Sequence, residues 1–172
     1  MITLVLGGAR SGKSNFAQQL ASDNQSLVLY VATATVSDNE MAERIAHHQH
    51  NRPGEWPVRE APLDLMSVLA EEGNKQQTIL VDCLTLWLNN QLFNFPEQNF
   101  DELFQQLVTV SHNSSAHIIF VANEVGLGII PMGNISRKFV DEAGRLNQKI
   151  AHIADQVFFV AAGLPLVLKN EK

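Results

Sequence analysis

The chain has 172 residues, of which 45% are hydrophobic and 17% charged, and these values suit one globular domain rather than a disordered chain. Its formal net charge is −6 and no stretch is rich in lysine and arginine, which argues against a nucleic-acid partner. The single cysteine, Cys83, excludes a disulfide within the chain, and we interpret it as a small buried residue of a cytoplasmic protein.

Short apolar segments alternate with segments of helical periodicity along the chain. In chain order the first half predicts a strand at 2–6, a helix at 13–22, a strand at 27–32, a helix from Asp38 to about Gln49, a short strand at 56–60 and a helix at 63–72. The second half predicts a strand at 78–81 that ends at Asp82, helices at 84–92 and 100–112, a strand at 117–122, a helix at 136–154, a strand at 157–161 and an edge strand at 166–168.

This alternation indicates βαβ units and a mainly parallel sheet covered by helices on both faces. Residues 1–172 are expected to form one domain, with ligands at the sheet edge where the strands have their carboxyl ends. No membrane span is expected, because the apolar stretch 157–168 is short and is broken by Gly163 and Pro165.

A phosphate-binding loop follows the first strand, because the residues there match the pattern G-x-x-x-x-G-K-[ST]. Backbone N–H groups of such a loop and the start of the next helix face the phosphates of ATP or GTP. Lys13 is expected to reach the β- and γ-phosphates, and the Ser14 hydroxyl to bind Mg²⁺. The fold predicted is a three-layer, RecA-like P-loop NTPase domain. For the loop itself, the alternative is a glycine-rich turn that binds no ligand. The predicted phosphate contacts are Gly7, Gly8, Ala9, Arg10, Ser11, Gly12, Lys13 and Ser14.

Asp82 ends a buried strand, where P-loop proteins often have a carboxylate that holds Mg²⁺ through water. We expect this strand to lie beside the phosphate loop. The alternative is that Asp82 caps the helix predicted from Leu84.

Three histidines lie close together between residues 44 and 52. At about 100° per residue, Met41, Ile45 and His48 fall on one stripe of a helix, whereas His47 and His50 point elsewhere, so convergence on one metal ion is not expected. His48 is open to two interpretations, a core histidine with a satisfied hydrogen bond or a nucleophile that attacks phosphorus as the neutral imidazole.

Several segments together resemble one family over nearly the whole chain. They are the phosphate loop, Tyr-Val-Ala-Thr-Ala at 30–34, Glu-Met-Ala-Glu-Arg-Ile-Ala-His-His at 40–48, Asn-Glu-Val-Gly-Leu-Gly-Ile-Ile-Pro at 123–131, and the helix around 139–148. The family is that of the bifunctional adenosylcobinamide kinases/adenosylcobinamide-phosphate guanylyltransferases of cobalamin biosynthesis.

The resemblance implies two reactions, phosphorylation of adenosylcobinamide by ATP or GTP and transfer of GMP from GTP to adenosylcobinamide phosphate through a GMP-histidine intermediate. The family's histidine corresponds to His48. Together with Lys13, it is one of the two catalytic residues expected here. A homotrimer is also implied. Alternatives are a P-loop small-molecule kinase without a covalent step and a non-catalytic GTP-binding module. Further nucleotide contacts implied by the resemblance are Ala32, Thr33, Ala34, Gln49, His50, Asn51, Arg52, Glu60 and Asp82.

Overall fold

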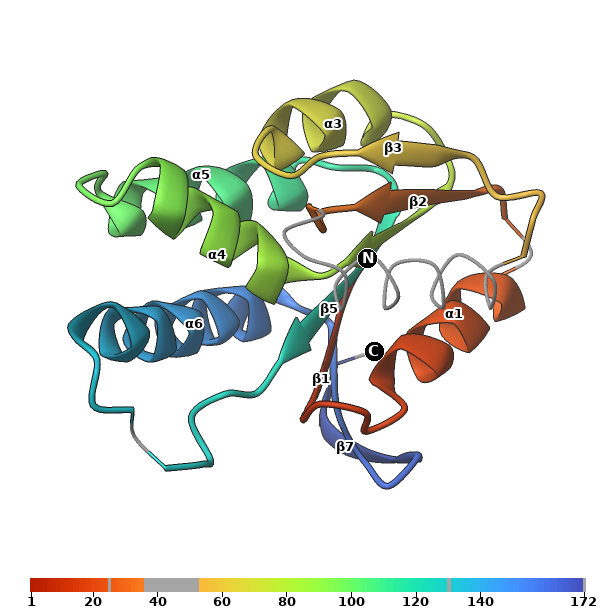
Figure 1. The fold of residues 1–172 in the computed structure, drawn as a ribbon. Coiled ribbons are helices and arrows are strands. Elements are labelled where there is room, and N and C mark those ends of the chain that lie inside the picture. Colours follow the sequence, from red (N-terminus) through yellow and green to blue (C-terminus); the bar gives the residue numbers. More distant parts are fainter. Residues whose placement is uncertain (25, 36–52, 130, 172) are drawn as a thin grey trace.

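The computed structural model describes residues 1–24, 26–35, 53–129 and 131–171 (Figure 1). Its strands are β1 (Ile2–Gly7), β2 (Val28–Ala32), β3 (Val58–Glu60), β4 (Thr78–Asp82), β5 (His117–Asn123), β6 (Gln156–Ala161) and β7 (Leu164–Asn170). Its helices are α1 (Lys13–Asp23), α3 (Leu65–Glu72), α4 (Leu84–Asn94), α5 (Phe100–His112) and α6 (Asn134–Ile153). None of these helices combines the length and the apolar character that a membrane crossing needs. The predicted helix from Asp38 to Gln49 lies outside the described residues.

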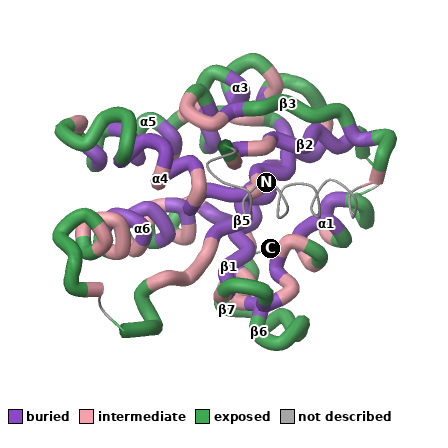
Figure 2. The backbone as a smooth tube through the Cα atoms, viewed as in Figure 1, coloured by how far each residue is buried: buried purple, intermediate pink, exposed green. Residues whose placement is uncertain are grey.

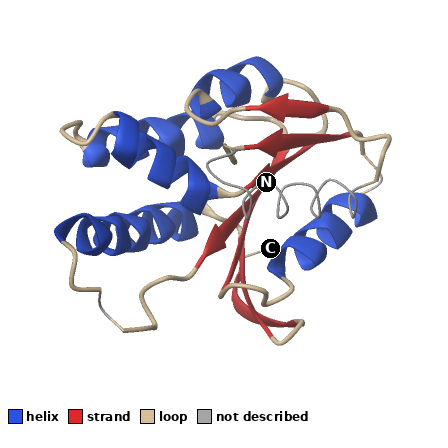
Figure 3. Cartoon of the chain, in the orientation of Figure 1, coloured by secondary structure: helices blue, strands red, loops and turns tan. Residues whose placement is uncertain are grey.

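The strands of the described residues form one sheet in the order β3-β2-β4-β5-β1-β6-β7. Neighbouring strands are parallel except β6 and β7, which run antiparallel. Among the described helices, α1 covers one face of the sheet and α3, α4, α5 and α6 cover the other (Figure 3). The predicted α/β fold, a mainly parallel sheet between two helical layers, is therefore confirmed.

Alternate residues of the central strands enter two separate apolar cores. Leu4 of β1 and Phe120 of β5 pack in the core below α3 to α6, whereas Val5 and Val121 pack with Ala17 of α1. All five are fully buried, and Figure 2 shows the central strands largely in the colour of buried residues. Burial on both faces is why these strands are continuous apolar runs in the sequence.

Helix α3 begins two residues later than predicted, because the residues before it are held by α4. The carbonyl of Leu63 accepts hydrogen bonds from Trp87 Nε1 at 3.0 Å and from Gln91 Nε2 at 2.9 Å. Strand β3 is shorter than predicted, since Trp56 is buried in the loop before it, in the apolar core on the α1 side of the sheet.

Strand β7 is longer than the predicted 166–168 and forms a hairpin with β6. The turn uses Ala162 and Gly163, with φ of 51° and 79°. A positive φ favours glycine, so Gly163 was the sequence signal for this turn. The hairpin leaves Leu164, Leu166, Val167 and Leu168 exposed.

His117, at the start of β5, is a half-buried group whose lowered pKa makes stability depend on pH. Its Nε2 lies 2.9 Å from Thr3 Oγ1, and its Nδ1 is hydrogen-bonded to Asn24. Burial lowers the pKa of His117 to about 4, helped by the positive N-terminus and opposed by Asp155. The unfolded chain takes up this proton near pH 6.5, well above the folded chain. The free energy of unfolding should therefore fall as the pH drops from about 6.5 towards 4.

Urea unfolding at several pH values checks this, with His117→Asn as the variant that cannot titrate and His152→Asn, at an exposed site, as the matched control. The stability difference between the unaltered chain and His117→Asn should shrink as the pH falls through this window. His152→Asn measures the effect of removing a histidine from an exposed site. Parallel pH curves for the unaltered chain and His117→Asn would contradict the account.

Candidate nucleotide-binding site

The loop between β1 and α1 has the backbone shape of a phosphate-binding loop. Gly12 precedes α1 with a φ of 93°, and Arg10 also has a positive φ, 55°. A side chain at Gly7 would place its Cβ 2.5 Å from both Ser11 Oγ and the carbonyl oxygen of Val160. Gly7 is therefore required because a side chain has no room, and Gly12 is favoured because of its positive φ.

The turn of the β6–β7 hairpin supports this loop from outside. Gly163 donates its N–H to the carbonyl of Ser11 at 2.8 Å. A Cβ at Gly12 would lie 3.1 Å from the Gly163 Cα, so the two backbones are in close contact. The sequence pattern did not predict this contact, because it joins residues about 150 positions apart.

Lys13 lies inside the loop rather than in solvent. It is buried, and its Nζ donates a hydrogen bond to the carbonyl of Gly8 at 3.1 Å. Burial lowers the pKa of Lys13, while Cys83 and Asp82 act in the opposite direction. The first turn of α1 has no acidic residue to occupy its N–H groups. The Lys13 ammonium group and the N-terminus of α1 are thus arranged to bind an anion.

Asp82 lies at the carboxyl end of β4, two places from β1 in the sheet, with β5 between them. It still acts on the loop, because α1 packs across β4 and the Asp82 charge reaches Lys13. Tyr30 donates its hydroxyl hydrogen to Asp82 Oδ2 at 3.1 Å. Asp82 does not cap α4, since the cap position is Cys83 and no side chain caps this helix.

The donors available for a metal are oxygen atoms. A carboxylate at Asp82 and a hydroxyl at Ser14, one residue after Lys13, are ligand types that Mg²⁺ prefers. Cys83 is buried and its pKa is raised to about 12, mainly by burial. At physiological pH it is a neutral thiol, which agrees with our interpretation of Cys83 as a small buried residue. A neutral thiol is not a metal ligand.

Thr33, just after β2, is used by the protein itself. Its Oγ1 donates to the carbonyl of Cys83 and accepts from the Cys83 N–H, each at 2.8 Å. Its N–H bonds to the carbonyl of Asp82 at 3.3 Å, and its carbonyl accepts from Asn90 at 2.8 Å. Thr33 therefore ties the end of β2 to the end of β4, and a direct polar contact of Thr33 with nucleotide stays a prediction.

The remaining predicted contacts are divided between one sheet edge and the part of the chain outside the described residues. Ala32 and Glu60 end β2 and β3, at the edge where the phosphate loop also begins, and Ala34 follows Thr33 just after β2. Glu60 is exposed, on a strand well away from β1 in the sheet order. The residues outside the described ranges are His48, Gln49, His50, Asn51 and Arg52.

One residue at this edge was not predicted as a site residue. Asn123 ends β5 and pairs with Gly7 in the register of the two strands. The signal that could have identified it is the one used for Asp82, a polar residue directly after a buried apolar strand.

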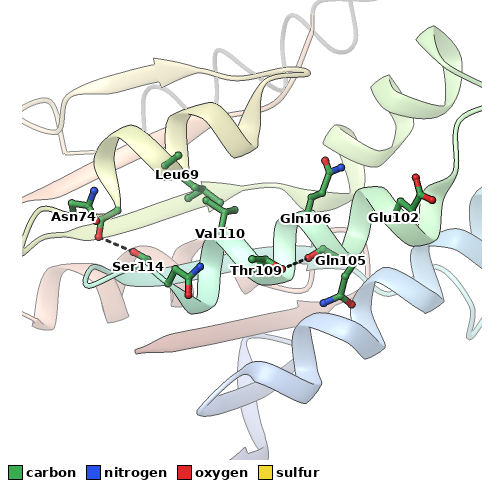
Figure 4. A pocket seen from close by; sticks show the side chains of 11 residues that line it. Leu69, Asn74, Glu102, Gln105, Gln106, Thr109, Val110 and Ser114 are labelled. Carbon is green, nitrogen blue, oxygen red and sulfur yellow. Dashed lines mark hydrogen bonds between the residues drawn. The ribbon is translucent and has the colours of Figure 1, made fainter.

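A separate groove of about 660 Å³ lies between α3 and α5, away from the loop (Figure 4). Its floor is apolar at Leu69 and Val110, and its only ionisable lining residue is Glu102. Without a cationic side chain among its lining residues, this groove does not suit phosphates.

Thr33→Val should lower the free energy of unfolding by about 1–3 kcal/mol, because the Cys83 N–H would be buried without an acceptor. Thr33→Ser, which keeps the hydroxyl, is the matched control and should stay close to the unaltered chain. Urea unfolding without nucleotide measures both. Equal stability of the valine and serine variants would show that these bonds do not join the strand ends.

Comparison with known proteins adds the family to this geometry. Among solved structures, the flagellar accessory protein FlaH of Methanocaldococcus jannaschii matches with a TM-score of 0.52 and 16% identity, over 98% of this chain and 78% of that one. The RadB recombinase matches with a TM-score of 0.51 and 12% identity, over 92% and 73%. An ATPase domain matches with a higher TM-score of 0.59, at 13% identity, over 99% and 77%. At these identities the likeness concerns the fold alone, and it agrees with a RecA-like P-loop domain.

Sequence relatives are much nearer. The bifunctional adenosylcobalamin biosynthesis protein CobP of Pseudomonas aeruginosa is 46% identical over 171 residues, covering 99% of both chains. The bifunctional adenosylcobalamin biosynthesis protein CobU of Salmonella typhimurium is 38% identical over 182 residues, covering 98% of this chain and all of that protein (100%). The family model of cobinamide kinase / cobinamide phosphate guanyltransferase matches residues 3–168. The chain therefore belongs to the cobinamide kinase/cobinamide phosphate guanylyltransferase family, whose members are bifunctional enzymes of adenosylcobalamin biosynthesis.

Proposed function

We propose that this chain phosphorylates the hydroxyl of adenosylcobinamide with ATP or GTP and then transfers GMP from GTP to adenosylcobinamide phosphate. The observation that carries the proposal is the complete phosphate loop, with Lys13 buried inside it, in a chain that matches the family over residues 3–168. One phosphate loop serves both reactions in this proposal.

The kinase step needs charge neutralisation and alignment more than covalent chemistry. The substrate hydroxyl oxygen attacks the terminal phosphorus, the bond to the bridging oxygen breaks, and the nucleoside diphosphate leaves with that electron pair while the hydroxyl proton passes to solvent. Lys13 and the loop N–H groups hold the phosphates. Ser14 and, through water, Asp82 would hold Mg²⁺, which would further neutralise the phosphate charge.

The nucleotidyl step is proposed to run through His48. An imidazole nitrogen forms a bond to the α-phosphorus of GTP, and pyrophosphate leaves. A phosphate oxygen of adenosylcobinamide phosphate then attacks the same phosphorus, and the histidine nitrogen leaves, giving adenosylcobinamide-GDP. Support for His48 comes from the sequence: a helix there would place it on one stripe with Met41 and Ile45, and residues 40–48 resemble the family.

The remaining nucleotide contacts are proposed at the sheet edge and in the segment after His48, at the positions implied by the resemblance. A homotrimer in the cytoplasm is proposed as the working form. The exposed apolar side chains of β7 support association between chains, since such patches mark protein interfaces. Light scattering that returns the mass of one chain would contradict the trimer.

A plain kinase, or a protein that only binds GTP, would share the fold and the loop, because fold does not decide activity. Neither alternative needs a reactive histidine. The covalent intermediate therefore separates the three possibilities.

GTP labelled at the α-phosphate, mixed with the purified protein and Mg²⁺, should leave acid-labile, base-stable label on the denatured chain. His48→Ala should abolish this label, and His47→Ala, at the neighbouring histidine predicted to point off the stripe, is the matched control that should retain it. Labelling should also weaken below about pH 6, because a protonated imidazole cannot attack. Absence of label in protein that still binds GTP, or label that survives His48→Ala, contradicts the covalent step.

A further inference from the structure

Two buried side-chain atoms among the described residues have no hydrogen-bond partner, and both belong to residues beside Gly7. They are Ser11 Oγ, inside the phosphate loop, and Asn123 Oδ1, at the end of β5. A buried polar atom without a partner costs about 1–3 kcal/mol, so proteins seldom retain one without a reason. Two of them around one phosphate-loop residue point to a ligand or a rearrangement at this place.

The direction of the Asn123 side chain follows from the alternation along β5. Ile118, Phe120 and Ala122 enter the core below α3 to α6, whereas Ile119 and Val121 enter the core below α1. Because side chains alternate along a strand, Asn123 points to the α1 side, where the phosphate loop turns into its helix. The same alternation along β4 places Asp82 on this side, since Leu80 packs below α1.

Hydrogen bonds fix the backbone around Asn123, whereas its side-chain amide oxygen has none among the described residues. The Asn123 N–H donates to Thr85 Oγ1 at 2.7 Å, and the next N–H, of Glu124, donates to the carbonyl of Gly7 at 3.0 Å. The amide oxygen of Asn123 has no hydrogen-bond partner within the described part of the chain. Rotation about the Cβ–Cγ bond exchanges the amide oxygen and the NH₂ group, so Asn123, fixed beside Gly7, can present its N–H donors where the unpartnered oxygen lies.

The terminal phosphate of a triphosphate belongs near this amide. Lys13, which reaches the β- and γ-phosphates in such loops, has its Nζ at the carbonyl of Gly8, one residue from Gly7. Gly7 and Asn123 are directly paired across neighbouring strands, which lie about 4.8 Å apart. An amide at that position is within reach of a phosphate bound at the Gly8 end of the loop.

We propose that the Asn123 amide donates a hydrogen bond to an oxygen of the phosphate that is transferred in the kinase step. This inference rests on the proposed kinase function. The amide stays neutral and takes up no proton. It aligns the terminal phosphorus for attack by the substrate hydroxyl and stabilises the charge on the transferred group, as preorganised donors do. Guanylyl transfer breaks the bond at the α-phosphorus, so it depends far less on this contact.

The test compares both reactions in the full-length protein. Asn123→Ala removes the donor, and Asn123→Asp keeps the size but replaces the donor with a negative charge. Both should lower kcat of phosphoryl transfer to cobinamide by about 10- to 100-fold, with KM for ATP within about threefold for the alanine variant. Labelling by GTP carrying an α-phosphate label should stay within about threefold, and the midpoint of thermal unfolding should stay close to that of the unaltered chain.

Each other outcome overturns the inference in a recognisable way. A kinase kcat that is unchanged in both variants shows that Asn123 does not contact the transferred phosphate. If Asn123→Ala lowers both activities equally while Asn123→Asp is as active as the unaltered chain, Asn123 has a packing role. Absence of phosphoryl transfer by the unaltered protein overturns the proposed kinase function itself, and this inference with it.

Discussion

The pairing of β1 on both sides, with β5 and β6, is the constraint on which the nucleotide site depends. It fixes Gly7 between Asn123 and Val160, so the chain leaves the sheet at a set point and in a set direction. The carbonyl of Val160 then leaves no room for a side chain at Gly7. The loop shape is therefore a consequence of strand order as much as of the glycines themselves.

The second feature of the site is a buried positive charge in an acidic chain. The chain has a net charge of −6, yet Lys13 is buried at the centre of the loop. A buried cation beside the start of α1 can attract phosphates even in an acidic chain. Asp82 opposes the lowering of the Lys13 pKa by burial, which helps to keep the lysine charged.

Local sequence patterns predicted the parts of this structure that depend on residues close together in the chain. The apolar runs predicted the central strands, and the phosphate-loop pattern predicted the turn into α1, because both are set by residues close together in the sequence. Strand order is different, since β5 enters between β1 and β4 through contacts that no local pattern encodes. The support of Ser11 by Gly163 and the use of Thr33 to join two strand ends were beyond prediction for the same reason.

The central claim is that one phosphate loop serves both reactions, and Lys13→Ala tests it most directly. Phosphoryl transfer to cobinamide and covalent labelling by GTP would be measured on the same preparation. Lys75→Ala, at an exposed lysine paired with Glu72, would be the matched control. The account predicts that Lys13→Ala lowers both rates by about 100-fold or more, while Lys75→Ala lowers neither. A Lys13→Ala protein that loses one activity and keeps the other would contradict it and would require a second triphosphate site.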